Sequence, residues 1–157
     1  MKKWGRMKKT LYIALLSSVA TWLTGCASEA SLNKQTSSGK PEGVYKNTTP
    51  EKVRNALIFY CNEKGLMVLQ ADTGSVICGK QQSGGAAILS QFAIGNSYST
   101  APMSKVRFTV SPINDDVKVW ADMWVETQMA TGQVQQMSVT DNASKNVIQQ
   151  RLDELKP

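Results

Sequence analysis

Histidine is absent from this sequence, and its absence excludes several kinds of active site. Ser-His-Asp triads, Cys-His pairs and histidine-containing metal sites all need an imidazole. Glycine-rich phosphate loops, acidic calcium loops and the Gly-x-Ser-x-Gly turn of hydrolases are missing as well. Asp122 and Glu126 stand four positions apart in a strand pattern, which is about 13 Å. The two carboxyls of a glycosidase need roughly 5–9.5 Å. We therefore expect a protein that is not an enzyme and that holds no metal or cofactor.

Hydrophobic residues near the start form only a short run. Leu11–Trp22 is uncharged and has about a dozen residues, whereas a bilayer-spanning helix needs roughly 17–25. Five basic residues precede this run, and the tetrapeptide Leu23-Thr24-Gly25-Cys26 follows it. A positive flank, a short apolar core and small residues at the end are typical of a secretory signal peptide.

The tetrapeptide Leu23-Thr24-Gly25-Cys26 resembles the lipobox of bacterial lipoproteins, residue by residue. The resemblance implies cleavage before Cys26, acylation of its sulfur and amine by fatty acids such as palmitate, and attachment to a membrane. Two or more acyl chains attach a protein stably to a membrane, whereas a single chain attaches it only marginally. In such lipoproteins an aspartate after the cysteine favours retention in the inner membrane. Ala27 and Ser28 follow Cys26 here, so the resemblance implies attachment to the outer membrane, with the domain facing the periplasm. The alternatives are an ordinary signal peptide or an uncleaved anchor, in either case with an incidental cysteine.

Cleavage at this site also changes the charge balance. The segment 1–25 holds five of the 18 Lys and Arg residues and none of the 12 acidic ones, which leaves 13 against 12. Nucleic-acid binding requires a basic surface, so we expect no nucleic-acid partner.

Cysteines are few. Besides Cys26 there are only Cys61 and Cys78, and an even pair in an exported protein indicates a disulfide. The two side chains are predicted on facing surfaces of a helix and a strand. Two separate buried thiols remain the alternative.

The chain divides into three parts by composition. Residues 1–25 are the predicted signal peptide, and 26–47 are the acylated cysteine with a disordered tether, because the tether has few large apolar residues. Residues 48–157 are the predicted single periplasmic domain.

The domain shows both helical and strand patterns. Thr49, Pro50 and Glu51 begin a helix that runs to about 64, where Gly65 ends it. Strand patterns follow at 66–70, 75–80, 104–111, 117–129 and 134–139, and a last helix begins after 140–142. This order predicts an α+β two-layer sandwich with a mainly antiparallel sheet of four to five strands and an N-terminal and a C-terminal helix.

Two places are candidates for partner binding. Trp120 and Trp124 share a strand face with charged residues, as aromatic hot spots of interfaces do; alternatively, the last helix or the segment 81–103 covers them. Within that segment, 86–94 is predicted to be a short helix. We expect its apolar side chains either to dock on a partner or the membrane, or to cap the open end of the core. These side chains are Ile88, Leu89 and Phe92.

We expect from these features a non-catalytic lipoprotein that binds another envelope protein in an assembly or secretion machinery. The run Tyr60-Cys61-Asn62-Glu63-Lys64 also resembles the Tyr-x-Cys region of membrane-bound lysozyme inhibitors, which implies inhibition of a lytic enzyme. That resemblance covers about ten residues, and the later pattern of the family is absent. A carboxylate-based hydrolase is a third hypothesis.

Overall fold

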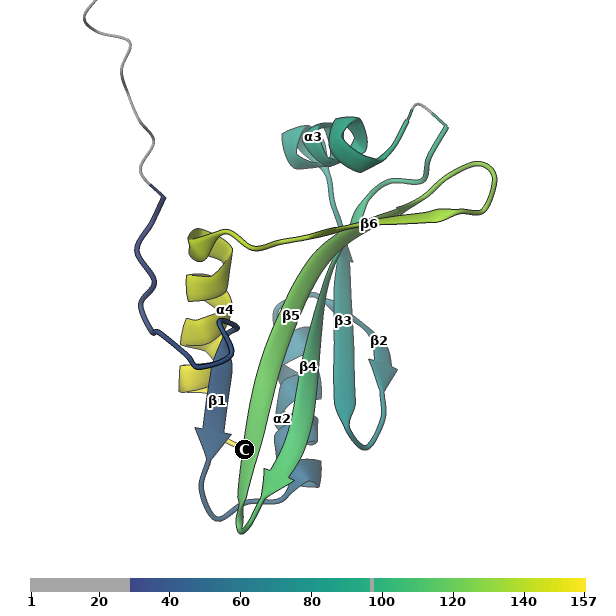
Figure 1. Cartoon of the computed structure of the whole chain (residues 1–157). Helices are drawn as coiled ribbons and strands as arrows, with labels where there is room; N and C mark the ends of the chain where they lie inside the picture. Colours follow the sequence, from purple (N-terminus) through teal and green to yellow (C-terminus); the bar gives the residue numbers. More distant parts are fainter. Residues whose placement is uncertain (1–28, 97) are drawn as a thin grey trace, which may run out of the picture.

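The computed structural model describes residues 29–96 and 98–157 and shows an α+β fold (Figure 1). Within that part the elements follow one another as β1 Glu42–Tyr45, α2 Pro50–Glu63, β2 Met67–Ala71, β3 Ser75–Gln81, α3 Gly84–Ile94, β4 Met103–Ile113, β5 Asp116–Gln128, β6 Val134–Ser138 and α4 Asn142–Glu154.

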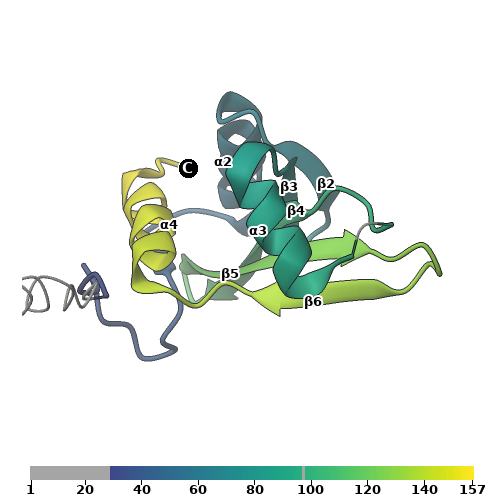
Figure 2. The same cartoon turned by 90° about the horizontal axis from the view of Figure 1, so that it is seen from above.

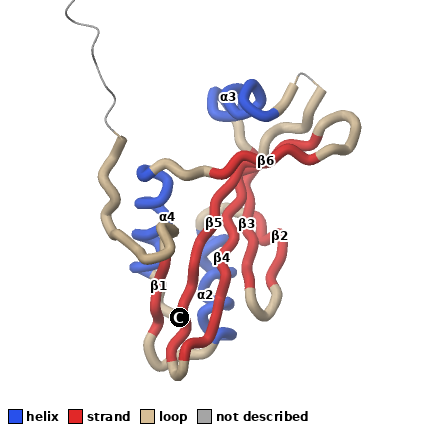
Figure 3. The backbone as a smooth tube through the Cα atoms, in the orientation of Figure 1, coloured by secondary structure: helices blue, strands red, loops and turns tan. Residues whose placement is uncertain are grey.

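All strand pairs of the sheet are antiparallel, and its order is β1-β5-β4-β3-β2, with β6 also paired to β5 (Figure 3). β4 pairs with β5 along its whole length, from Met103 opposite Glu126 to Ile113 opposite Asp116. β1 and β6 pair with the other edge of β5, one at each end of that strand. The predicted antiparallel sheet is confirmed, with six strands in the described residues in place of four to five.

Helix α2 begins and ends where the sequence predicts. The N–H of Lys52 donates to the Thr49 hydroxyl at 3.4 Å, which caps the first turn. Gly65 follows the helix with φ of +67°, a conformation that only glycine adopts without strain. One face of α2 is buried against β2, β3 and β4, through Val53, Leu57 and Cys61.

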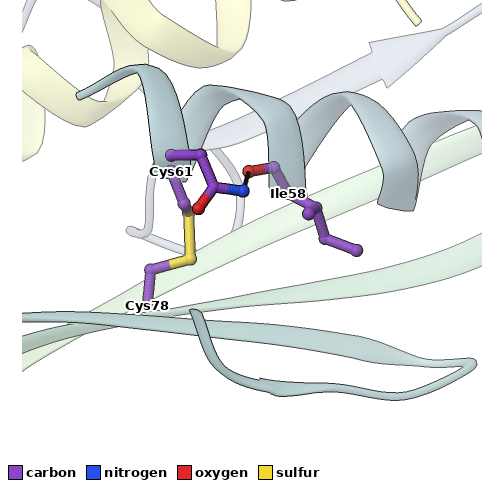
Figure 4. Close-up of a disulfide and its surroundings, with 4 residues drawn as sticks. Ile58, Cys61 and Cys78 are labelled. Atoms are coloured by element: carbon purple, nitrogen blue, oxygen red, sulfur yellow. Dashed lines mark hydrogen bonds between the residues drawn. A yellow bond between two sulfur atoms is a disulfide. The ribbon is translucent and has the colours of Figure 1, made fainter. Parts of the chain in front are cut away.

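The predicted disulfide between Cys61 and Cys78 is confirmed, and it joins α2 to β3 (Figure 4). Both cysteines are fully buried in the main hydrophobic core, which also contains Phe108. The Tyr60 ring meets the Phe108 ring edge-on, with 6.2 Å between centroids. The bridge thus crosses the core between helix and sheet, where it holds α2 against the strand that α2 covers.

Opening this disulfide should destabilise the domain. For a sequence separation of 17, the chain-entropy model gives a loss of about 3 kcal/mol in the free energy of unfolding. Urea unfolding of the folded chain with and without a reductant measures the loss. The Cys61→Ala/Cys78→Ala variant is the control, since the reductant should not change its unfolding. Equal urea midpoints for the oxidised and reduced chains would contradict the expectation.

Helix α4 holds the edge strand β1 through two buried side chains. Gln149 accepts from the Glu42 N–H and donates to the Glu42 carbonyl, both at 2.9 Å, as a neighbouring strand would. The Tyr45 hydroxyl donates to the Leu152 carbonyl at 2.8 Å. Burial raises the pKa of this hydroxyl far above its ordinary value, and the Asp153 carboxylate adds to the rise.

The prediction of a disordered tether up to residue 47 is wrong for Glu42–Tyr45, which form β1. The backbone of this short segment pairs with β5, and Tyr45 is buried in the core. These tertiary contacts offset the entropy that the segment loses on ordering, although its own composition offers few large apolar residues. Residues 29–41 have no regular secondary structure but also contact α4. Asn33 N–H donates to Asn146 Oδ1 at 2.8 Å, and Lys34 Nζ lies 3.1 Å from Asp153 Oδ1.

A chain that begins at Thr48, the predicted domain boundary, should therefore be less stable than one that begins at Glu29. The shorter chain loses β1 and leaves the space of Tyr45 empty, and removal of a buried aromatic side chain alone costs about 3–5 kcal/mol. A chain that begins at Lys40 is the matched control, because it keeps β1. Urea unfolding of the three chains measures the difference, and equal stability of the Thr48 and Lys40 chains would refute the role of β1.

The helices α2 and α4 lie on the same side of the sheet (Figure 2). Leu57 of α2 and Leu152 of α4 belong to one core cluster with Val76, Phe108 and Val119 of the sheet. None of the helices in the described ranges is long and apolar enough to span a bilayer.

Candidate functional site

The face of the sheet opposite to α2 and α4 is the candidate functional site, and we call it the outer face. Along β5 the side chains alternate between buried and half-buried, so odd-numbered residues enter the core and even-numbered residues reach the outer face. The outer-face residues of β4 and β5 are mainly charged or aromatic: Lys105, Arg107, Thr109, Lys118, Trp120, Asp122, Trp124 and Glu126.

Trp124 is half-buried and is held in place by charged neighbours. The Arg107 guanidinium lies 5.2 Å from the centroid of its ring, within cation–π range. The indole N–H donates to Glu126 Oε2 at 3.1 Å. The ring is therefore fixed at its face by Arg107 and at its polar edge by Glu126.

Glu126 joins β4, β5 and β6 on this face. Lys105 of β4 pairs with one carboxylate oxygen, and Gln136 of β6 donates to the other at 2.9 Å. Burial raises the pKa of the Glu126 carboxyl, but the hydrogen bonds from its three partners outweigh burial and bring this pKa below its usual value. The group is thus kept ionised, which is the opposite of what a general acid needs.

Trp120 has a similar arrangement at the other end of the face. Lys118 Nζ lies 5.1 Å from the centroid of the Trp120 ring and 3.2 Å from Glu42 Oε2. Glu42 stands opposite Trp120 in the pairing of β1 with β5. Strand β1, which the sequence pattern does not predict, therefore supplies the Glu42 carboxylate that pairs with Lys118 beside Trp120.

A hollow of about 360 Å³ lies beside Trp124. It sits where β1 and β6 leave the middle of β5 without a strand partner, and two single hydrogen bonds close that gap: Ala121 N–H to the Pro41 carbonyl (2.9 Å) and Val139 N–H to the Met123 carbonyl (3.0 Å). Its lining combines both charges with the indole, through Lys40, Arg107, Asp122, Trp124 and Gln136.

A second concavity of about 660 Å³ lies on the helix side of the sheet. Its floor is apolar and comes from β3, β4 and β5, while α2, α3 and α4 supply the walls. Residues that line it include Leu66, Val106, Met123, Val125 and Ile148. We call it the helix-side groove.

The other predicted site residues lie apart from the outer face. Ile88 and Leu89 are exposed on α3. Phe92 belongs to the same helix, and its side chain is outside the described part of the structure. Cys26 also lies outside the described residues. The run from Tyr60 to Lys64 forms the end of α2 and buries Cys61 in the core, so it presents no exposed strand.

The acidic residues of the outer face are engaged in ion pairs. Asp122 Oδ1 lies 2.7 Å from Lys40 Nζ, and Glu126 pairs with Lys105. Among the described residues no group of three or more Cys, Asp or Glu side chains is placed to hold a metal ion.

Comparison with known proteins gives no relative: no family model, no curated protein and no solved structure matches this chain. The assignment of a site therefore depends on the geometry alone. Arg107 and Glu42 were not recognised as site residues from the sequence, because their contacts with the tryptophans depend on strand register. Arg107 does alternate with core residues of its strand, and that pattern places it on the outer face.

The ion pair and hydrogen bonds at Glu126 give a testable dependence on pH. Because the pKa of Glu126 is lowered on folding, its carboxylate stabilises the fold above its ordinary pKa of 4.5, and this contribution is lost as the pH falls through the lowered value. Glu126→Gln should cost about 1 kcal/mol at pH 7. The cost should be smaller at pH 3, which lies below the ordinary pKa of this carboxyl, as followed by urea unfolding at both pH values. The same loss at both would contradict the assignment.

Proposed function

We propose that this protein is a non-catalytic lipoprotein, anchored to the outer membrane through acylated Cys26. Its periplasmic domain binds another envelope protein through the outer face and serves as a component of an assembly or secretion machinery. The observation that carries the binding function is the pair of half-buried tryptophans, Trp120 and Trp124, on a sheet face that α2 and α4 leave uncovered.

The anchor is supported by the tetrapeptide Leu23-Thr24-Gly25-Cys26 after a short apolar run. The disulfide between Cys61 and Cys78 agrees with export, since such bonds persist in oxidising compartments such as the periplasm. With Cys26 acylated and Cys61 bonded to Cys78, all three cysteines of the chain have a role.

The binding function is supported by the composition and order of the outer face. Tryptophan and arginine are the residues most enriched at interface hot spots, and Arg107 stacks on Trp124. Because the ion pairs and the indole hydrogen bond already fix these side chains, a partner that meets them immobilises few further rotamers. The hollow beside Trp124 offers a place for a partner side chain.

The architecture that we propose for this role is a two-layer sandwich. The sheet is one layer, and α2 with α4 forms the other, because both helices contribute to one core on the same side of the sheet. One side of the sheet is then committed to folding and the other is available for a partner.

The experiment is capture of the partner by crosslinking in cells, from photoreactive residues at positions 120 and 124, with identification by mass spectrometry. In co-purification, Trp120→Ala/Trp124→Ala should weaken recovery of the captured protein by about tenfold or more, since a hot-spot residue contributes about 2 kcal/mol or more. Phe59→Ala is the matched control, because Phe59 is an exposed aromatic on α2 with 69 % of its surface accessible. Capture of no envelope protein, or equal recovery by the tryptophan variant and wild type, would refute the proposal.

A further inference from the structure

Helix α3 exposes large apolar side chains to solvent. Ile88 and Leu89 are 57 % and 72 % exposed, whereas Ser90 is buried at 9 %. Surface helices of globular domains normally bury the apolar stripe and expose the polar residues. Tyr98, which follows the helix, is 81 % exposed. Ile88 and Leu89 of α3 thus point outward, away from the core of the domain.

The segment around α3 also carries no charge. Residues 81–104 contain no Lys, Arg, Asp or Glu, although charged residues make up 19 % of the chain. Transfer of a charged side chain into an apolar medium is very costly, and this segment avoids that cost. An uncharged surface with outward apolar side chains suits contact with hydrocarbon better than contact with water.

The docked N-terminal segment begins, at Glu29, near one end of the domain. Asn142 N–H donates to Glu29 Oε1 at 3.2 Å, and Asn146 Nδ2 donates to the Ser31 carbonyl at 2.7 Å, so residues 29–31 are held at the start of α4. Cys26 precedes Glu29 by three residues. Because a chain spans at most about 3.6 Å per residue, the two Cα atoms lie within about 11 Å of each other.

The start of α4 and helix α3 lie at the same end of the molecule, at the top of Figure 1. Ala86 of α3 and Ser144 of α4 both line the helix-side groove. The turn between β4 and β5 lies at the opposite end (Figure 1). The end that carries the exposed apolar helix is therefore the end from which Cys26 is reached.

We propose that α3 is a second membrane contact, with Ile88 and Leu89 inserted into the surface of the bilayer that holds the acyl chains of Cys26. This inference rests on the proposed acylation of Cys26. With residues Gly84–Ile94, α3 is far shorter than a spanning helix and lies along the interface. The contact fixes the orientation of the domain. The long strands β4 and β5 point away from the membrane, and their outer face, with Trp120 and Trp124, is open to a partner in the periplasm.

The test is photocrosslinking of the full chain in cells, with benzoylphenylalanine in place of Leu89 or of Ile113. Ile113 is the matched control, since it is 42 % exposed and ends β4 beside the turn at the opposite end. We expect adducts of membrane lipid at position 89 and none above background at position 113. Mass spectrometry of the peptide that contains Cys26, from the same sample, reports whether that residue carries fatty acids.

Each outcome decides a different point. Protein adducts in place of lipid adducts at position 89 would show that α3 docks on a protein and would overturn the inference. Acylated Cys26 with equal adducts at 89 and 113 would refute the orientation and leave the anchor in place. Cys26 without fatty acids would refute the anchor and the orientation together. Crosslinks from position 124 are read separately, so binding through the outer face stands or falls by itself.

A second measurement excludes misfolding as the cause of a lost signal. Ile88→Ser/Leu89→Ser removes only exposed side chains, so the Cys61–Cys78 disulfide should still form. With benzoylphenylalanine at Tyr98, this variant should lose the lipid adducts that the otherwise unchanged chain forms at that position. An Ile113→Ser chain should keep them. Loss in both variants, or in neither, would contradict a specific contact through α3.

Discussion

The antiparallel pairing of β4 with β5 is the constraint on which the core and the candidate site both depend. Val119 and Val125 of β5 point into the core beneath the helices, and the residues next to them, Trp120 and Trp124, point to the outer face. A shift of one residue in register would exchange the two faces. Burial of the valines therefore fixes the tryptophans outward, opposite Thr109 and Lys105 of β4.

The charges of the domain act mainly in pairs. Lys105 with Glu126, Lys118 with Glu42 and Lys40 with Asp122 all flank the outer face. Single exposed pairs contribute little to stability, but here two of the lysines belong to pairs that are less than one quarter exposed. Their main effect is to hold the indole rings and the strand edges in one arrangement, which suits a preformed binding surface.

The capture of β1 by β5 and α4 changes what the N-terminal segment does. A tether of about 21 disordered residues would let the domain reorient within a root-mean-square span of roughly 25 Å. In the structure, Gln149 and Tyr45 fix β1, and Asn146 holds residues 31 and 33 along α4. The described segment from Glu29 to β1 is thus part of the fold, and it does not leave the domain free to reorient about that segment.

The sequence by itself determined the elements whose signals are local. Caps and helical spacing located α2 and α4, alternation located β3, β4 and β5, and the even pair of cysteines with their faces indicated the disulfide. Tertiary structure alone decided that Glu42–Tyr45 is a strand, that Arg107 and Glu42 meet the tryptophans, and that β1 and β6 share one edge of β5. Local patterns reflect contacts within a few residues, whereas these features depend on pairing between segments that lie far apart along the chain.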